Sequence, residues 1–355
     1  MKKKLLFLFP IIALFFILSA CGNNNSSSDS RNLLSEPLSK SEFILGTHVS
    51  VRIYDRGKEQ ALEDVFKYMS ELGDKLDVNN NLGSQMDQVN AAAGKHPVVV
   101  DEDVFWIVQE AMRYAKESNG IFEPTIGPIT SLWRIGFDDA RKPSQAEIDE
   151  KLKLVNYHWV TLNEKDRSVF LQKEGMKIDL GAIAKGAICD LAVKFLEERG
   201  VTTGIVDLGG NVFVIGHSFR GETTPWNVGV QDPNQARNTT IFTLPGVDQS
   251  FVTSGIYERF LEVDGVKYHH IMDPKTGYPM NNDLASVSII SPHSVDGDGL
   301  TTVLFGLGVE KGRQFIENMD GIDAVFVTRE NKVYVTNGIK NEFVLPEGSA
   351  YTMGE

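Results

Sequence analysis

The spacing of apolar residues along the first part of the chain predicts two amphipathic helices. From Glu59 to Asp77 the apolar residues lie three or four positions apart, as on one helix face: Leu62, Val65, Phe66, Met69, Leu72 and Leu76. The same spacing from Asp103 to Ser118 predicts a second helix. Asn119 and Gly120 follow it directly, and both residues favour a helix end.

The middle of the chain is less regular. Residues 121–128 contain two prolines and a glycine, which favour an ordered loop. Ser144 and Glu147 have the spacing of a capping box and predict a short helix that runs to about residue 155. Residues 176–179 resemble a strand, and residues 182–199 a helix that Gly200 would end.

After Gly200 most segments have the alternation of strands. Asp264 and Gly265 predict a tight hairpin between residues 259–263 and 266–272. Residues 285–291 predict a further strand, and helices are expected over about 298–307 and on to 319. Because strands outnumber helices and mostly follow one another through hairpins, the predicted fold class is α+β.

The N-terminus has the pattern of an export signal over residues 1–20. A basic start, Lys2 to Lys4, precedes an uncharged run from Leu5 to Ala20 that is short for a membrane span. The run ends in Leu18-Ser19-Ala20-Cys21, the pattern of a bacterial lipobox, so we expect Cys21 to be lipidated. A plain transmembrane anchor with an incidental cysteine is the alternative.

Residues 21–40 are expected to form a flexible tether, because they are rich in Asn and Ser and hold few large apolar side chains. The folded domain is then expected over residues 41–355, anchored by lipid to the extracytoplasmic face of the cell membrane.

Charge and cysteine content narrow the function classes. The formal net charge is −13, and removal of a signal with three lysines makes it −16. An acidic chain of this kind argues against a nucleic-acid partner, which requires clustered cations. Only two cysteines are present, without a C-x-x-C pair, which excludes the usual thiolate zinc, redox and iron–sulfur sites.

Three segments carry residues suited to chemistry. The first is the run from Asp179 to Gly186, where a carboxylate and Lys185 flank a predicted helix start. Free N–H groups and a lysine at that start suit a phosphate. The alternative is a capping role for Asp179 and a solvated Lys185.

The second segment is residues 296–302, where Asp298 and Thr302 are four apart at the expected start of a helix. That spacing places a carboxylate and a hydroxyl on one face, two oxygen ligands of the kind that Mg²⁺ accepts. The alternative is that Asp298 caps the helix while Thr302 bonds back to a carbonyl.

The third segment is a predicted strand that runs through His269 and His270 into the turn Asp273-Pro274. Adjacent strand residues face opposite sides, so only one histidine can point into a given cleft. His270 is the candidate for proton transfer, because its ordinary pKa is near neutral. Gly209-Gly210-Asn211 is interpreted as a tight turn and not as a dinucleotide-binding motif.

The order and wording of these motifs resemble the FAD:protein FMN transferase (ApbE) family. The resemblance rests on residues 179–186, 208–211, 254–259, 270–277 and 298–302 and extends from about Phe43 to Val327. It implies an ApbE-like fold with mixed, largely antiparallel sheets flanked by helices. It also implies an enzyme that binds FAD and Mg²⁺ and attaches FMN through a phosphoester to a Ser or Thr of an acceptor flavoprotein, releasing AMP.

The resemblance also implies roles for individual residues. Asp298 and Thr302 would be side-chain metal ligands, Ala182 would add its backbone carbonyl, and His270 would act with Asp298 in transfer. The expected flavin or FAD contacts are Leu45, Phe122, Glu123, Thr125, Asp179, Lys185 and Met272.

Two alternatives remain open at this point. An enzyme of the same fold could pass the FMN group to water and act as an FAD pyrophosphatase. A lipid-anchored protein could instead bind flavin without turnover.

Overall fold

The computed structural model describes residues 31–79, 83–236 and 239–354, and its centre is a nine-stranded sheet. Every pairing in this sheet is antiparallel except the last, between β15 and β16. In spatial order the strands are β1 (Leu38–Ile44), β2 (Thr47–Ile53), β6 (Gly204–Leu208), β7 (Asn211–Ile215), β10 (Gln249–Gly255), β13 (Leu284–Ser291), β14 (Asp323–Thr328), β15 (Lys332–Val335) and β16 (Thr352–Met353). The largely antiparallel α+β prediction is therefore confirmed.

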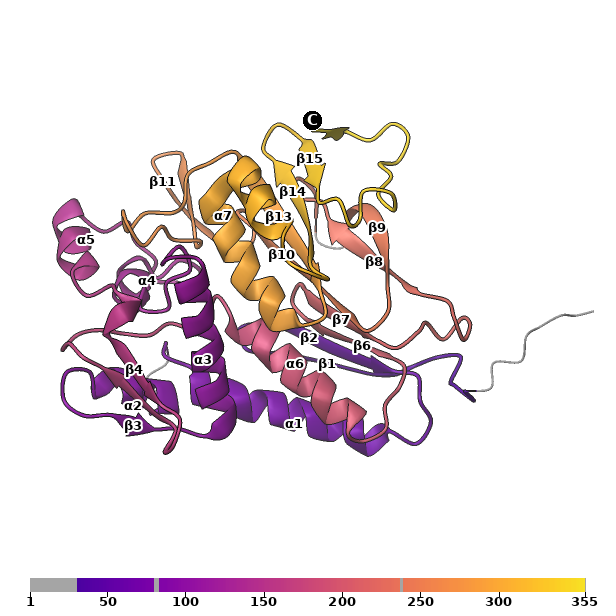
Figure 1. The fold of residues 1–355 in the computed structure, drawn as a ribbon, viewed down its shortest axis with the longest axis horizontal. Helices are drawn as coiled ribbons and strands as arrows, with labels where there is room; N and C mark the ends of the chain where they lie inside the picture. Colours follow the sequence, from indigo (N-terminus) through magenta and orange to yellow (C-terminus); the bar gives the residue numbers. More distant parts are fainter. Residues whose placement is uncertain (1–30, 80–82, 237–238, 355) are drawn as a thin grey trace, which may run out of the picture.

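Three helices cover one face of this sheet: α1 (Glu59–Leu76), α6 (Ala184–Glu197) and α7 (Ser294–Ile316) (Figure 1). The predicted apolar face of α1 is confirmed, because all six of its apolar residues are buried. Burying a large aliphatic side chain contributes about 1.5–3 kcal/mol, so this face stabilises the attachment of α1 to the sheet.

The opposite face of the sheet carries a second core. There the hairpin of β8 (Trp226–Gln231) and β9 (Thr240–Gly246) packs with the C-terminal segment, and Trp226, Phe242 and Phe343 are among the buried side chains. The sheet is therefore covered on both faces over its central strands.

The remaining elements form a smaller region beside the helices (Figure 1). It contains α2 (Gln85–Ala91), α3 (Glu102–Glu117), α4 (Gly127–Trp133), α5 (Gln145–Leu152), a 3₁₀ turn (Tyr157–Trp159), and the sheet of β3 (Val98–Val99), β5 (Ser168–Leu171) and β4 (Val160–Asn163). The predicted capping box of Ser144 and Glu147 begins α5. The predicted hairpin is also confirmed, as β11 (Phe260–Val263) and β12 (Val266–His269).

Residues 176–179, predicted as a strand, make only an isolated bridge, between Lys177 and Ile126. The two helices expected over 298–319 are confirmed, because α7 consists of two helical segments on either side of Gly308, whose φ of 73° and ψ of −179° are not helical. The first of them begins earlier than expected, at Ser294. Glycine adopts this positive φ without a steric penalty, so the chain can turn between the two segments.

The ordered region also begins earlier than expected. β1 starts at Leu38, within the range assigned to the flexible tether, because seven residues pair with β2. Residue Leu34 already donates its N–H to the carbonyl of Tyr54, at 2.8 Å. The predicted export signal and Cys21 lie outside the described residues and stay predictions. In the described ranges, no helix combines the length and apolarity needed to cross a bilayer.

Candidate active site

The starts of α6 and α7 meet at the buried carboxylate of Asp298. This side chain is 3% exposed, and its Oδ2 accepts the backbone N–H of Gly186 at 2.6 Å. Its Oδ1 accepts the amide of Asn211 at 2.7 Å and lies 3.5 Å from the Nζ of Lys185. Lys185 in turn donates to Asn211 Oδ1 at 2.7 Å. Lys185, Asn211 and Asp298 therefore form one connected polar cluster.

The two helices cap each other. Asp298 of α7 binds an N–H in the first turn of α6, while Asp190 of α6 accepts the N–H groups of Ser294 and Val295 at 2.6 and 2.8 Å. Neither helix has a side-chain cap at its own N-cap residue. Each aspartate thus satisfies backbone donors that would otherwise lack partners. Burial raises the pKa of Asp190 to about 7.

Glycines allow this close approach. A Cβ at Gly186 would lie 2.3 Å from the carbonyl oxygen of Ser294, so any side chain there would push the two helices apart. Gly297 and Gly299, which flank Asp298, are packed against Val252 and the ring of Tyr114 in the same way. These glycines serve packing around Asp298.

The first turn of α7 is also held from the side of α3. Asp296 accepts hydrogen bonds from the hydroxyl of Tyr114 and from Arg113, the latter at 3.0 Å. Together with Asp190, this contact holds the α7 start from two directions. Asp298 is therefore carried on a rigid segment.

The structure corrects two details of the predicted metal motif. α7 begins at Ser294, so Asp298 lies inside the helix and does not open it. The hydroxyl of Thr301, and not that of Thr302, donates to the carbonyl of Asp298, at 3.0 Å. The Thr301 hydroxyl also accepts a hydrogen bond from the hydroxyl of Ser254. Thr302 is half-buried and follows Asp298 by about one helical turn, which keeps both on one face.

Asp179 does not cap α6 and Lys185 is not simply solvated. The Asp179 carboxylate accepts the Thr130 hydroxyl at 2.7 Å and the Gly181 N–H at 2.8 Å. It thereby joins α4 to the turn that precedes α6. Both capping and solvation alternatives from the sequence are therefore wrong for this segment.

His270 is positioned by the backbone of Arg259. The backbone N–H of His270 donates to the carbonyl oxygen of Arg259. The ring Nδ1 of His270 lies 3.2 Å from the same oxygen. A carbonyl only accepts, so Nδ1 carries the hydrogen and Nε2 keeps its lone pair. Burial lowers the pKa of His270 to about 4, and the charges of Arg259 and Lys185 act in the same direction. The ring is therefore neutral near pH 7.

The predicted flavin loop is tied to the protein interior. The side chains of Phe122 and Thr125 are 1% and 0% exposed. Glu123 accepts hydrogen bonds from Thr125 and from the N–H of Tyr157, and burial raises its pKa. These side chains stabilise the loop, so a ligand contact here would come mainly from backbone atoms. Their contact with flavin stays a prediction.

Two further predicted contacts lie apart from the polar cluster. Met272 is buried against Trp133, Ile129 and Ile148 in a small separate core. Leu45 occupies the β1–β2 turn with φ of 57°, and its side chain packs on α1. A bulky residue in this left-handed region of φ is strained, so the surrounding structure must hold the β1–β2 turn in this conformation.

The predicted metal ligands are, by their chemistry alone, of the kind that a small hard cation accepts. Throughout residues 31–79, 83–236 and 239–354, no three His, Cys, Asp or Glu side chains gather as a metal site. Asp298, Thr302 and the carbonyl of Ala182 are instead one carboxylate and two neutral oxygens, a sparse donor set that suits Mg²⁺. The Gly186 N–H donates to Asp298 and so does not bond the carbonyl of Ala182, four residues earlier.

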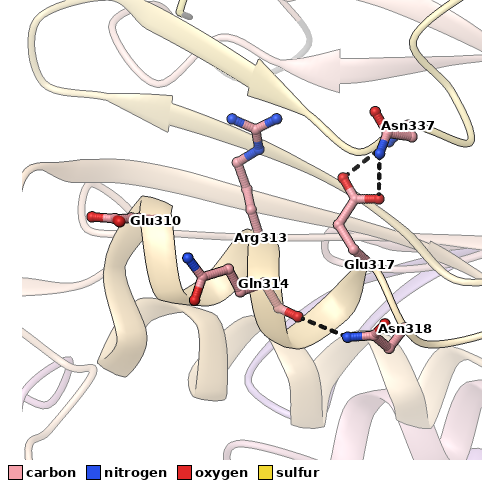
Figure 2. Close-up of a pocket in the computed structure, with 6 residues that line it drawn as sticks. All are labelled: Glu310, Arg313, Gln314, Glu317, Asn318 and Asn337. Atoms are coloured by element: carbon pink, nitrogen blue, oxygen red, sulfur yellow. Dashed lines mark hydrogen bonds between the residues drawn. The ribbon is translucent and has the colours of Figure 1, made fainter.

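Two surface cavities in the described part of the chain are lined by residues other than this cluster. One, of about 440 Å³, lies on the C-terminal half of α7 and is lined by Arg313, Glu317 and Asn337 among others (Figure 2). The other, of about 500 Å³, is bordered by Gln231, Pro233, Asn234, Gln235, Tyr257 and Glu258. Neither brings together groups with the chemistry of the α6–α7 junction.

Sequence reasoning missed two residues of this junction. Asn211, interpreted as part of a tight turn, is 1% exposed and links Lys185 to Asp298. Asp190 lies on α6 among apolar residues. An acid in such an apolar stretch was the only sequence signal that Asp190 is buried and functional. Both roles depend on contacts between segments far apart in the chain.

Comparison with known proteins agrees with this architecture. The ApbE family model matches residues 45–326. An FAD:protein FMN transferase of Klebsiella pneumoniae (strain 342) is 40% identical over 84% of this chain and 92% of its own length. One of Treponema pallidum (strain Nichols) is 38% identical over 85% and 87%. The crystal structure of an ApbE protein from Thermotoga maritima has a TM-score of 0.79 at 31% identity, covering 86% of this chain and 99% of that one. This chain therefore belongs to the ApbE family.

Proposed function

We propose that this chain is an FAD:protein FMN transferase. It cleaves FAD, attaches FMN by a phosphoester bond to a Ser or Thr of an exported acceptor protein, and releases AMP. Relatives that are 40% and 38% identical over most of the chain carry this name. The structural observation that supports the proposal best is the cluster of Lys185, Asn211 and Asp298 at the start of α6.

The diphosphate of FAD would bind at this helix start. The positive end of the α6 helix dipole lies at this start, and Lys185 adds a full positive charge. Asp298, Thr302 and the carbonyl of Ala182 would hold Mg²⁺. When bound, this cation would neutralise charge on the diphosphate, which an acidic protein otherwise repels.

His270 would act as the base for the acceptor. Its neutral ring, with the proton on Nδ1, leaves Nε2 able to take the proton of the attacking hydroxyl. The hydroxyl oxygen then forms the new bond to the FMN phosphorus while the bond to the AMP oxygen breaks. Phosphoryl transfer mainly requires positioning and charge neutralisation, which these groups supply.

The enzyme would work outside the cytoplasm. The export signal over residues 1–20 and the lipobox that ends at Cys21 support attachment by lipid to the extracytoplasmic face of the cell membrane. A flavoprotein acceptor exported to the same compartment would meet it there.

The direct test is mass spectrometry of an acceptor flavoprotein after incubation with this protein, FAD and Mg²⁺. We expect a mass increase of one FMN on a Ser or Thr, with AMP released in equal amount. Asp298→Ala should abolish the adduct and weaken the Mg²⁺-dependent binding of FAD. If Asp298→Ala labels the acceptor at the normal rate, the assigned site is wrong.

The same assay separates the alternatives. AMP released equally with and without acceptor, and no labelled protein, would identify an FAD pyrophosphatase. Retained flavin without AMP under any divalent metal would identify a flavin-binding lipoprotein.

A further inference from the structure

The buried carboxylate of Asp298 has a cation beside it. The Nζ of Lys185 lies 3.5 Å from Oδ1 of Asp298, and among the described residues Asp298 is the one acid within ion-pair distance of Lys185. The side chain of Asp298 is 3% exposed, whereas that of Lys185 is 29% exposed. The carboxylate is therefore shielded from water, while a ligand can still reach the ammonium of Lys185.

Asn211 holds Lys185 in this position. An ammonium only donates hydrogen bonds and a carboxylate only accepts them, so the amide of Asn211 must turn its Oδ1 to Lys185 and its Nδ2 to Asp298, both at 2.7 Å. Asn211 is 1% exposed and begins β7, where it pairs with Val252 of β10. A lysine side chain is flexible in general, but here its end is fixed to a buried amide on the central sheet. The positive charge of Lys185 therefore stays beside Asp298.

The proposed metal ion would share Asp298 with Lys185. The other two proposed ligands, the hydroxyl of Thr302 and the carbonyl of Ala182, are neutral and add no negative charge. One carboxylate would then face both an ammonium and a divalent cation. Two cations beside one buried carboxylate repel each other strongly, because little water screens them. Before FAD binds, the charge of Lys185 would therefore weaken the binding of the metal.

The diphosphate of FAD would remove this repulsion, because it brings negative charge to both cations. The other acids of the α6–α7 junction do not take this part. Asp296 is paired with Arg113, and Asp190 accepts two backbone N–H groups of α7. Once FAD is bound, Lys185 would bind the diphosphate and no longer oppose the metal.

We infer that Lys185, held in place by Asn211, makes the binding of the divalent metal depend on FAD. This inference rests on the FAD and metal binding of the proposed function. By thermodynamic linkage, FAD tightens the binding of the metal by the same factor by which the metal tightens the binding of FAD. Lys185 thus keeps the metal from occupying the site alone, and the metal and FAD bind together.

The test compares Lys185→Met, which removes the charge and keeps a long side chain, with Lys185→Arg, which keeps the charge. The control is Lys194→Met, which removes an exposed lysine from the last turn of the same helix. The probe is Mn²⁺, which accepts the same oxygen ligands as Mg²⁺ and whose free concentration is measured by electron paramagnetic resonance. Each purified protein is titrated with Mn²⁺, with and without FAD. No acceptor is added, and AMP is measured to verify that FAD stays intact.

For wild type and Lys194→Met, we expect FAD to tighten Mn²⁺ binding by about tenfold or more. Without FAD, Lys185→Met should bind Mn²⁺ at least about fivefold more tightly than wild type, and FAD should then tighten this binding much less. Lys185→Arg should match wild type without FAD. Equal or weaker Mn²⁺ binding by Lys185→Met without FAD overturns the inference. Tighter binding by Lys185→Arg also overturns it, because the charge is then not the cause.

Failure of the proposed function gives a different result. A wild-type chain that shows this linkage but transfers FMN to no acceptor contradicts the transferase function and still supports the role of Lys185. A wild-type chain that binds neither FAD nor Mn²⁺ overturns both.

Discussion

At the scale of single residues, two adjacent threonines on α7 have different surroundings. The Thr301 hydroxyl is fully buried between Ser254 and the carbonyl of Asp298. Thr302 is half-buried on the face that carries Asp298. This contrast allows a ligand role to be separated from a packing role by matched substitutions.

Thr302→Ala should raise the Mg²⁺ concentration needed for half-maximal transfer by about tenfold, because one oxygen ligand is lost. Thr301→Ala should leave this concentration unchanged and lower the free energy of unfolding by about 1–3 kcal/mol, since it breaks buried hydrogen bonds. Magnesium titrations and denaturant unfolding check both. Equal Mg²⁺ requirements for Thr302→Ala and wild type would remove Thr302 from the metal site.

His270 should show its lowered pKa in the pH dependence of transfer. The ring is neutral above about pH 4, so the acid limb of kcat/KM for FAD should lie near 4 and not near 6.5. As the pH falls, His270 is protonated in the unfolded chain near pH 6.5, before it is protonated in the folded chain. The free energy of unfolding therefore decreases as the pH falls from 6.5 toward 4. Transfer rates from pH 4 to 8 check the limb, with His270→Gln as the control. A limb near 6.5 that disappears in His270→Gln would contradict this assignment.

At the scale of secondary-structure elements, the junction of α6 and α7 depends on caps exchanged between helices. Asp190 serves α7 and Asp298 serves α6, and Gly186 lets the backbones approach. A helix start that caps itself would not need a neighbour. Here the position of each helix start depends on the other helix. A change in the packing of α6 against α7 would therefore move Asp298 relative to Lys185.

Asp190→Ala should lower the free energy of unfolding by about 1–2 kcal/mol at pH 8, because two N–H groups at the start of α7 lose their acceptor. It should also weaken transfer, since Asp298 lies on the same helix. The control is Glu197→Ala, an exposed acid at the end of α6. Denaturant unfolding and the transfer assay are the measurements. Equal stability of the two variants would show that the cap contributes nothing.

At the scale of the whole molecule, the sheet places the ends of distant strands beside the two helix starts. Asn211 begins β7 and Ser254 lies near the end of β10, next to it in the sheet. The site is therefore assembled from distant chain segments at the ends of these strands, since Gly186 and Asp298 are 112 residues apart. The proposed attachment to a membrane would depend on Cys21.

Cys21→Ser should release the protein from the membrane fraction without changing transfer by the purified chain, because the proposed lipid site precedes the segments that carry the active site. Cell fractionation and mass spectrometry of the N-terminus check this. The matched control is Cys189→Ser, whose buried thiol cannot accept lipid. A Cys21→Ser protein that stays membrane-bound would favour a transmembrane anchor.

The sequence by itself determined the elements that depend on neighbouring residues. The apolar face of α1, the capping box of α5 and the hairpin at Asp264-Gly265 each follow from a local pattern. The motifs around Lys185 and Asp298 also identified the family, because their order along the chain is specific.

Only the tertiary structure decided which groups meet. No local pattern signals that Asn211 bridges Lys185 and Asp298, or that Asp190 caps a helix a hundred residues away. The edge strand β1 was likewise missed, because its polar residues are ordered by pairing with β2 and not by an apolar pattern of their own. Hydrogen bonds between distant segments depend on the packing of the whole chain, so they cannot be derived from the spacing of residues within one segment.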